Sequence, residues 1–218
     1  DVLDVVASNV PYEADTQVEE KFINLAIAGM PNVGKSSLVN CIINKEKSIV
    51  TDIAGTTRDA IDSYINYYND EFRLIDTAGI RKKSKLLDDI EYYSSVRSFR
   101  AIDESDITAV VIDVSKGLSK QDRNIISYVI DKGKGLLIVL NKWDLIEKDN
   151  YTLKNIQDDM IASYPMLAYF PMMFISVKNN LRVRDVLKNA RKVHYERQRT
   201  IKTNDLNNFL EKVTYNYP

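Results

Sequence analysis

The stretch GMPNVGKSSL, residues 29–38, directly follows the apolar run FINLAIA, residues 22–28. It contains the spacing G-x-x-x-x-G-K-S between a run typical of a buried strand and a helical pattern, which is the context that a P-loop requires. Glycines allow successive backbone N–H groups to face a phosphate chain, and the helix N-terminus adds its positive end. A chance glycine turn would not explain the strand and helix on either side. The sequence therefore predicts a strand, loop and helix that bind a phosphate compound.

Within this loop, the side chains have separate expected roles. Lys35 places a positive charge beside the β and γ phosphates, and the Ser36 hydroxyl is the type of ligand that Mg²⁺ takes in P-loop proteins. We expect phosphate contacts from Gly29, Asn32, Val33, Gly34, Lys35, Ser36 and Ser37.

The rest of the chain predicts an α/β fold. Short apolar runs alternate with longer segments of helical periodicity, which indicates a mainly parallel sheet with helices on both faces. A turn signal at Asn69 and Asp70 joins two strands, so one edge strand should run antiparallel and make the sheet mixed. The apolar runs lie at residues 22–28, 72–76, 108–114, 136–141 and 172–176.

The sequence NKWD, residues 141–144, follows the strand-like run LLIVL and indicates which base is bound. The Asp144 carboxylate can accept hydrogen bonds from N1–H and the exocyclic amine of guanine, whereas adenine offers no such pair of donors. GTP is therefore predicted over ATP, and an ATP-dependent kinase or ATPase would require the purine preference to be reversed. The guanine site is expected to use Asn141, Lys142, Asp144, Ser176, Val177 and Lys178, the last three through the SVK segment after the final strand.

Two further segments predict the metal and the γ-phosphate contacts. Asp76, which begins DTAGI after a strand, is placed to hold a Mg²⁺-bound water, and the Gly79 N–H to meet the γ-phosphate. GTTRD, residues 55–59, lies between the P-loop and that strand, and Thr57 is the expected second Mg²⁺ ligand, with Thr56 the alternative.

Five such signals in this order resemble the translation-factor-like GTPases and, more narrowly, the second GTPase domain of the Der (EngA) family. The matching segments are GMPNVGKSSLVN, TDIAGTTRD, DTAGIRKKSK, SVRSFRAI, KQDRNI, NKWDL and TNDLNNFLEKV. By this resemblance, residues 1–21 are the end of a preceding GTPase domain and a linker, 22–198 a Ras-like P-loop G domain, and 199–218 the truncated start of a KH-like domain. Val177 is a departure, since the family more often has alanine there.

The resemblance implies a GTP-hydrolysing molecular switch that assists assembly of the large ribosomal subunit. The implied partners are GTP and GDP, the large subunit or its rRNA, and the preceding GTPase and KH-like domains of the full-length protein. The alternative function is a regulatory scaffold module that holds the nucleotide with negligible hydrolysis. The isoleucine at position 80 favours this alternative, because Ras-like enzymes orient the attacking water with a glutamine there.

Asn32 offers another source of catalytic charge. Its side-chain oxygen lies in the phosphate loop, where it could help to bind a monovalent cation. In the GTPases that the chain resembles, asparagine at this place accompanies activation by K⁺. The alternative is that Asn32 only braces the loop by a local hydrogen bond. The catalytic set expected is thus Lys35, Asn32, Thr57 and Gly79, with Mg²⁺ and K⁺ as cofactors.

Composition excludes several other classes of protein. The chain has 218 residues, 44% hydrophobic and 28% charged, and no apolar run approaches the roughly 20 residues of a membrane span. Its single cysteine, Cys41, fits a reducing compartment, and it would also fit a secreted protein that uses no disulfides. We expect a cytoplasmic protein with no membrane partner. Net charge is −1, but basic residues cluster after residue 181, either as a solvated helix face or as a surface toward RNA.

Overall fold

A computed structural model describes residues 22–45, 62–77, 99–149, 151–200 and 202–216. The predictions for Thr56, Thr57 and Gly79, and for the segment 1–21, lie outside the described residues.

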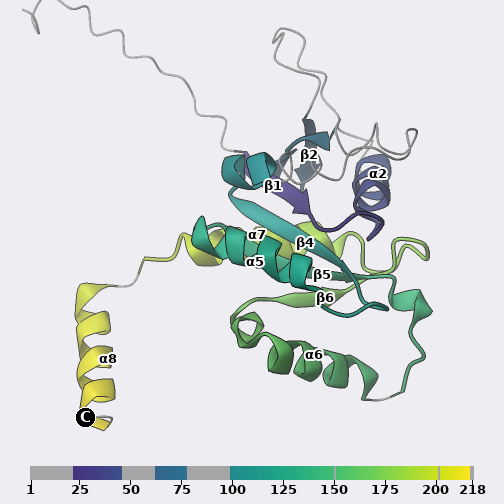
Figure 1. The fold of residues 1–218 in the computed structure, drawn as a ribbon. Helices are drawn as coiled ribbons and strands as arrows, with labels where there is room; N and C mark the ends of the chain where they lie inside the picture. The colour runs from purple at the N-terminus through teal and green to yellow at the C-terminus, as the bar shows by residue number, and fades with distance from the viewer. Residues whose placement is uncertain (1–21, 46–61, 78–98, 150, 201, 217–218) are drawn as a thin grey trace, which may run out of the picture.

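The core is one six-stranded sheet in the order β2-β3-β1-β4-β5-β6 (Figure 1). All neighbouring strands pair in parallel except β2 and β3, which pair antiparallel at one edge. The predicted mixed, mainly parallel sheet is therefore confirmed. The strands are β1 (Ile23–Ala28), β2 (Ser63–Tyr67), β3 (Asp70–Leu74), β4 (Ile107–Asp113), β5 (Gly135–Asn141) and β6 (Met172–Phe174).

The turn between β2 and β3 lies one residue earlier than predicted. Tyr68 and Asn69 form it, and Asp70 already pairs with Tyr67 as the first residue of β3. Tyr68 has a positive φ of 56°, an unusual conformation for a bulky residue. The Asn69-Asp70 turn signal did not predict that Tyr68 would be part of the turn.

Helices connect the strands and cover both faces of the sheet. They are α2 (Lys35–Lys45), α5 (Lys120–Asp131), α6 (Thr152–Ser163), α7 (Asp185–Arg197) and α8 (Thr203–Asn216), with short 3₁₀ turns η2 (Trp143–Leu145) and η3 (Pro165–Tyr169). Residues 99–104 are also helical. The start of α5 shows why the chain turns helical there, since Ser119 and Asp122 form a capping box that satisfies backbone N–H groups.

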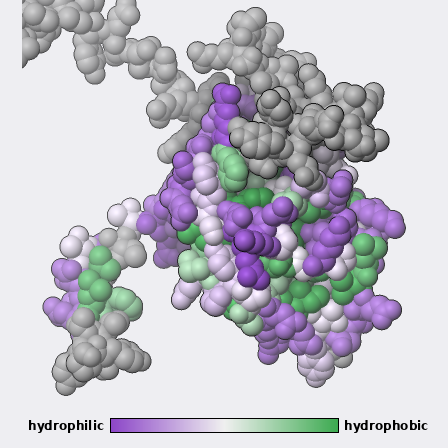
Figure 2. All heavy atoms as spheres, in the orientation of Figure 1, coloured by the Kyte–Doolittle hydropathy of each residue, from purple (hydrophilic) through white to green (hydrophobic). Residues whose placement is uncertain are grey.

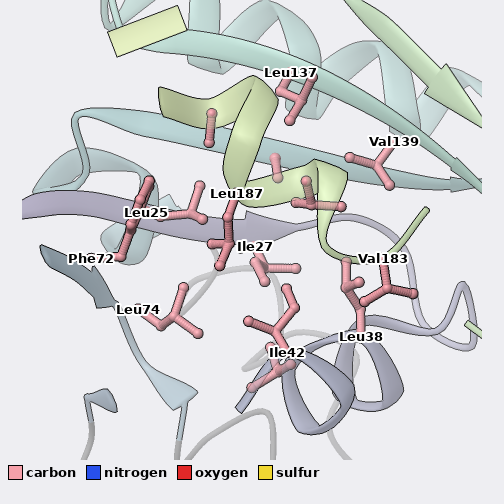
Figure 3. Close-up of a cluster of buried hydrophobic side chains, with 14 of the residues drawn as sticks. Leu25, Ile27, Leu38, Ile42, Phe72, Leu74, Leu137, Val139, Val183 and Leu187 are labelled. Carbon is pink, nitrogen blue, oxygen red and sulfur yellow. The ribbon is translucent and has the colours of Figure 1, made fainter. Parts of the chain in front are cut away.

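Two apolar cores, one on each face, explain why the central strands are apolar throughout. On β4, Val111 packs into the core beneath α2 and α7, whereas its neighbour Val110 packs into the core beneath α5 and α6. Successive side chains of a strand point to opposite faces, so every residue of β4 is buried. Figure 3 shows the first core, where Leu38 and Ile42 of α2 and Leu187 of α7 meet the sheet.

Helix α8 lies within the segment 199–218, which the resemblance assigns to the start of a KH-like domain. Its apolar residues Leu206, Phe209 and Leu210 are 43%, 62% and 48% exposed, and Figure 2 shows them as a green stripe on this helix. The domain boundary at residue 199 stays a prediction. Among the described residues, no helix has the length and apolar character to cross a membrane.

Candidate nucleotide-binding site

The P-loop connects β1 to α2, and two of its glycines are required by their surroundings. Gly29 and Gly34 have φ angles of 139° and 102°, which L side chains rarely adopt. A Cβ atom at Gly29 would lie 2.3 Å from the Val111 carbonyl oxygen, and one at Gly34 would lie 2.3 Å from Asn141 Nδ2. The loop can follow this path only because both positions lack a side chain.

Lys35, the first residue of α2, is tied back onto this loop. Its Nζ donates to the carbonyl oxygens of Gly29 at 2.7 Å and Met30 at 2.6 Å. The ammonium is thus fixed beside the phosphate cradle instead of extending into solvent. This placement is consistent with its predicted role as a fixed positive charge at the phosphates.

Asn141 joins three segments that lie far apart in the sequence. Its side chain is 3% exposed, Nδ2 donates to the Val33 carbonyl at 2.8 Å, and Oδ1 accepts from the Val177 N–H at 3.1 Å. These two partners fix the orientation of the amide, because one is an acceptor and the other a donor. The end of β5 thereby holds both the P-loop and the SVK segment after β6. The sequence placed Asn141 in the site but did not predict this clamp.

Asp144 is held by a second residue of the SVK segment. The Ser176 hydroxyl donates to Asp144 Oδ1 at 2.5 Å, and the same hydroxyl accepts from the Asn179 N–H at 3.1 Å. The bond from Ser176 lowers the pKa of Asp144 below its ordinary value, so the carboxylate stays ionised and accepts hydrogen bonds. The Ser176 side chain is fully buried, and its hydroxyl positions Asp144.

Lys142 pairs with Asp113, a carboxylate that belongs to none of the sequence motifs. Its Nζ lies 2.7 Å from Oδ2 of Asp113, the last residue of β4, which is 4% exposed. Burial tends to raise the pKa of Asp113, but hydrogen bonds from Lys142 and Ser115 outweigh it and leave the pKa below its ordinary value. Lys142 has a φ of 66°, and this ion pair helps to fix that turn.

Trp143 anchors the same turn from within. It is 7% exposed, and its ring centroid lies 4.5 Å from that of Phe174. The backbone N–H of Trp143 donates to the Ile175 carbonyl at 3.0 Å. The variable position of NKWD therefore contributes to packing.

Asp76 lies just beyond the end of β3, at the same edge of the sheet as the P-loop, because β3 and β1 are parallel neighbours. Its φ is 55°, and its N–H donates to Asp62 Oδ1 at 2.9 Å. Asp62 Oδ2 in turn pairs with Arg73, at 2.7 Å to Nε and 2.6 Å to the terminal nitrogen. The residue before β2 thus positions the predicted Mg²⁺ ligand, a role for which the sequence carries no motif.

We expect Asp62→Ala to raise the Mg²⁺ concentration needed for tight GTP binding severalfold, because Asp76 loses its backbone anchor. Asp62→Ala also removes the bonds to Arg73, and hydrogen bonds to charged groups contribute about 1.5–3 kcal/mol each to stability. Mg²⁺ titrations of GTP affinity and urea unfolding measure the two effects. Asp62→Asn keeps an acceptor for the Asp76 N–H, so it should lower stability while leaving the Mg²⁺ requirement near wild type. Equal Mg²⁺ requirements in all three proteins would contradict the positioning role.

Comparison with known proteins agrees with this site. A model of the family described as 50S ribosome-binding GTPase matches residues 24–142, which include the P-loop, Asp76 and the first two residues of the NKWD motif, Asn141 and Lys142. The chain belongs to the 50S ribosome-binding GTPase family. GTPase Der of Clostridium tetani is 43% identical over 212 residues, which are 97% of this chain and 48% of that protein. GTPase Der of Chloroflexus aggregans is 42% identical over 218 residues, 100% of this chain and 49% of that protein. The chain spans about half the length of the curated relatives it matches.

Solved structures show the same fold. A crystal structure of Era in complex with MgGDPNP and nucleotides 1506–1542 of 16S ribosomal RNA has a TM-score of 0.55 at 24% identity, covering 75% of this chain and 54% of that one. Elongation factor SelB from Methanococcus maripaludis with the GTP analogue GPPNHP has a TM-score of 0.58 at 19% identity, covering 84% and 35%. The predicted P-loop GTPase fold is therefore confirmed for this family member.

Proposed function

We propose that this chain is the GTP-binding and GTP-hydrolysing domain of a molecular switch. The observation that carries the proposal is the Asn141 clamp together with the Asp144 carboxylate, oriented by Ser176. A carboxylate fixed and ionised at this edge matches the two donors of guanine. Lys35, tied to the loop carbonyls, supplies the positive charge for the β and γ phosphates. The lysine of SVK, Lys178, completes the proposed base site.

The residues present fit a Mg²⁺ ion, which takes oxygen ligands from protein side chains and from the phosphates of a bound nucleotide. Ser36 at the start of α2 and Asp76 after β3 supply a hydroxyl and a carboxylate, and we propose Thr57 as the further ligand. When bound, Mg²⁺ would neutralise charge on the β and γ phosphates. Gly79 is proposed to meet the γ-phosphate through its N–H and so to sense its loss.

Asn32 is proposed as a ligand of K⁺. It has a φ of 64° and is exposed at the tip of the P-loop, and its side chain forms no hydrogen bond with any residue that the structure describes. The side chain is therefore not committed to bracing the described part of the loop, which was the alternative. A cation at this place would stabilise the negative charge that develops between the β and γ phosphates during hydrolysis, the role that an arginine finger has in other GTPases.

In single-turnover GTP hydrolysis, we expect K⁺ to accelerate the wild-type chain severalfold over Na⁺ at equal ionic strength. Asn32→Ala should remove that difference because the cation loses a ligand. Asn44→Ala, an exposed asparagine on α2, is the matched control and should keep it. Equal rates in both salts would contradict the K⁺ hypothesis. Rates that stay negligible in both would favour the alternative, a regulatory scaffold that holds GDP or GTP.

The family and the relatives support a proposal about the cellular role. The family description names ribosome binding, and the similarity to GTPase Der covers nearly the whole chain. We propose that the protein assists assembly of the large ribosomal subunit in the cytoplasm, with residues 1–21 as the end of a preceding GTPase domain and a linker. Helix α8 would then be the first helix of a KH-like domain, and its exposed apolar stripe would pack within that domain.

A further inference from the structure

A groove of about 900 Å³ lies between α7 and the turn that joins β2 to β3. It is separate from the nucleotide site, because the site is at the carboxyl ends of the parallel strands, whereas β3 begins at this turn. The residues that line it and matter here are Tyr67, Tyr68, Arg184, Lys188, Arg191 and Lys192.

The groove carries excess positive charge. Lys188 and Lys192 are exposed one helical turn apart on α7, and neither forms an ion pair with any residue in the described ranges. Two carboxylates lie nearby, and one of them is already engaged, since Asp70 accepts from both Arg191 and Tyr195. This contact fixes α7 against the start of β3. Asp185 is the carboxylate that remains, and the four basic residues of the lining outnumber these two carboxylates.

An exposed aromatic ring lies at the mouth of this basic groove. Tyr68 is 83% exposed, although a bulky residue in a positive-φ turn is uncommon. Its ring meets the buried Tyr67 edge to face at a centroid distance of 4.8 Å, which limits its motion. Tyr68 therefore offers an exposed ring, held by Tyr67, in the same groove that Lys188 and Lys192 line.

We propose that this groove binds a single-stranded segment of RNA. Its phosphates contact Lys188 and Lys192, and an unpaired base stacks on Tyr68, the combination by which proteins bind single strands. An acidic peptide could pair with Lys188 and Lys192, but it would leave the exposed Tyr68 ring without a stacking partner. The proposal rests on the proposed ribosomal role only for the source of the RNA, since charge and stacking are properties of the groove itself.

Fluorescence anisotropy with a fluorescein-labelled 12-nucleotide oligouridine tests the proposal on the whole chain. Reversing both charges in K188E/K192E should lower the affinity about tenfold or more at low salt. The plot of log affinity against log salt has a negative slope, to which each phosphate contact on a single strand contributes about −0.7. Losing two contacts should therefore make the slope less steep by roughly 1.4. Tyr68→Ala should lower the affinity about fivefold or more and leave the salt slope unchanged, because stacking releases no counterions.

K120E/K154E provides the matched control, because it makes the same change in net charge on exposed residues of α5 and α6. It should keep RNA affinity within about twofold of wild type. A comparable loss in both double variants would show a net-charge effect and overturn the proposal. Displacement of the RNA by an equally charged polyglutamate peptide at equal concentration would assign the groove to acidic peptides instead. Single-turnover GTP hydrolysis without RNA should be unchanged in K188E/K192E, which separates this test from the test of the GTPase.

Discussion

Replacing Asp144 with asparagine is expected to lower the affinity for GTP about 10²–10⁴-fold and to raise the affinity for xanthosine triphosphate. The carboxylate is proposed to accept two hydrogen bonds from guanine, and bonds to a charged group contribute about 1.5–3 kcal/mol each. An asparagine presents one donor in place of an acceptor, so it opposes the guanine amine and matches the carbonyl oxygen that xanthine carries there. Competition titrations with fluorescent nucleotides measure both affinities.

The control for this prediction is Asp158→Asn, on the exposed surface of α6, which should leave both affinities at wild-type values. Ser176→Ala should give an intermediate result, because Asp144 stays present but loses the hydroxyl that holds Oδ1. If Asp144→Asn binds GTP as tightly as wild type, the carboxylate does not read the base. The chain would then recognise guanine by other groups or not at all.

The sequence was sufficient for those features of the site that depend on local spacing. A P-loop is a continuous segment, so the strand, loop and helix follow from neighbours in the chain, and the structure confirms this arrangement, whereas the nucleotide contacts of the loop residues stay a prediction. The same holds for Asn141 and Asp144 at the end of β5. Trp143, at the variable position of the same motif, is buried against Phe174.

The contacts that position these residues could not be predicted, because they depend on which strands become neighbours. Asp62 reaches Asp76 only through the antiparallel register in which Ser63 faces Leu74, and a shift of one residue would remove the contact. Asp113 meets Lys142 because β4 and β5 end side by side. Neither pair has a fixed separation in sequence. A buried acidic residue at the end of an apolar strand, such as Asp113, was the one available signal.

Asn141→Ala is expected to lower the free energy of unfolding by about 2–4 kcal/mol and to weaken GTP binding at least tenfold. The substitution leaves the Val33 carbonyl and the Val177 N–H without their partner, and a buried polar group left unsatisfied costs about 1–3 kcal/mol. Because these groups belong to the P-loop and to the SVK segment, phosphate and base contacts should weaken together. Urea unfolding and nucleotide titration measure the two effects, and Asn155→Ala on exposed α6 should change neither.

The clamp also predicts coupling between Asn141 and Gly34. Gly34→Ala should be strongly destabilising on its own, because the new Cβ would lie 2.3 Å from Asn141 Nδ2 in a backbone conformation of φ 102°. In the Asn141→Ala background that steric conflict disappears and only the backbone strain remains, so the double variant should lose less stability than the two single losses combined. Strict additivity would contradict this coupling, because it would mean that the new Cβ does not conflict with the Asn141 amide and that the whole cost of Gly34→Ala is backbone strain.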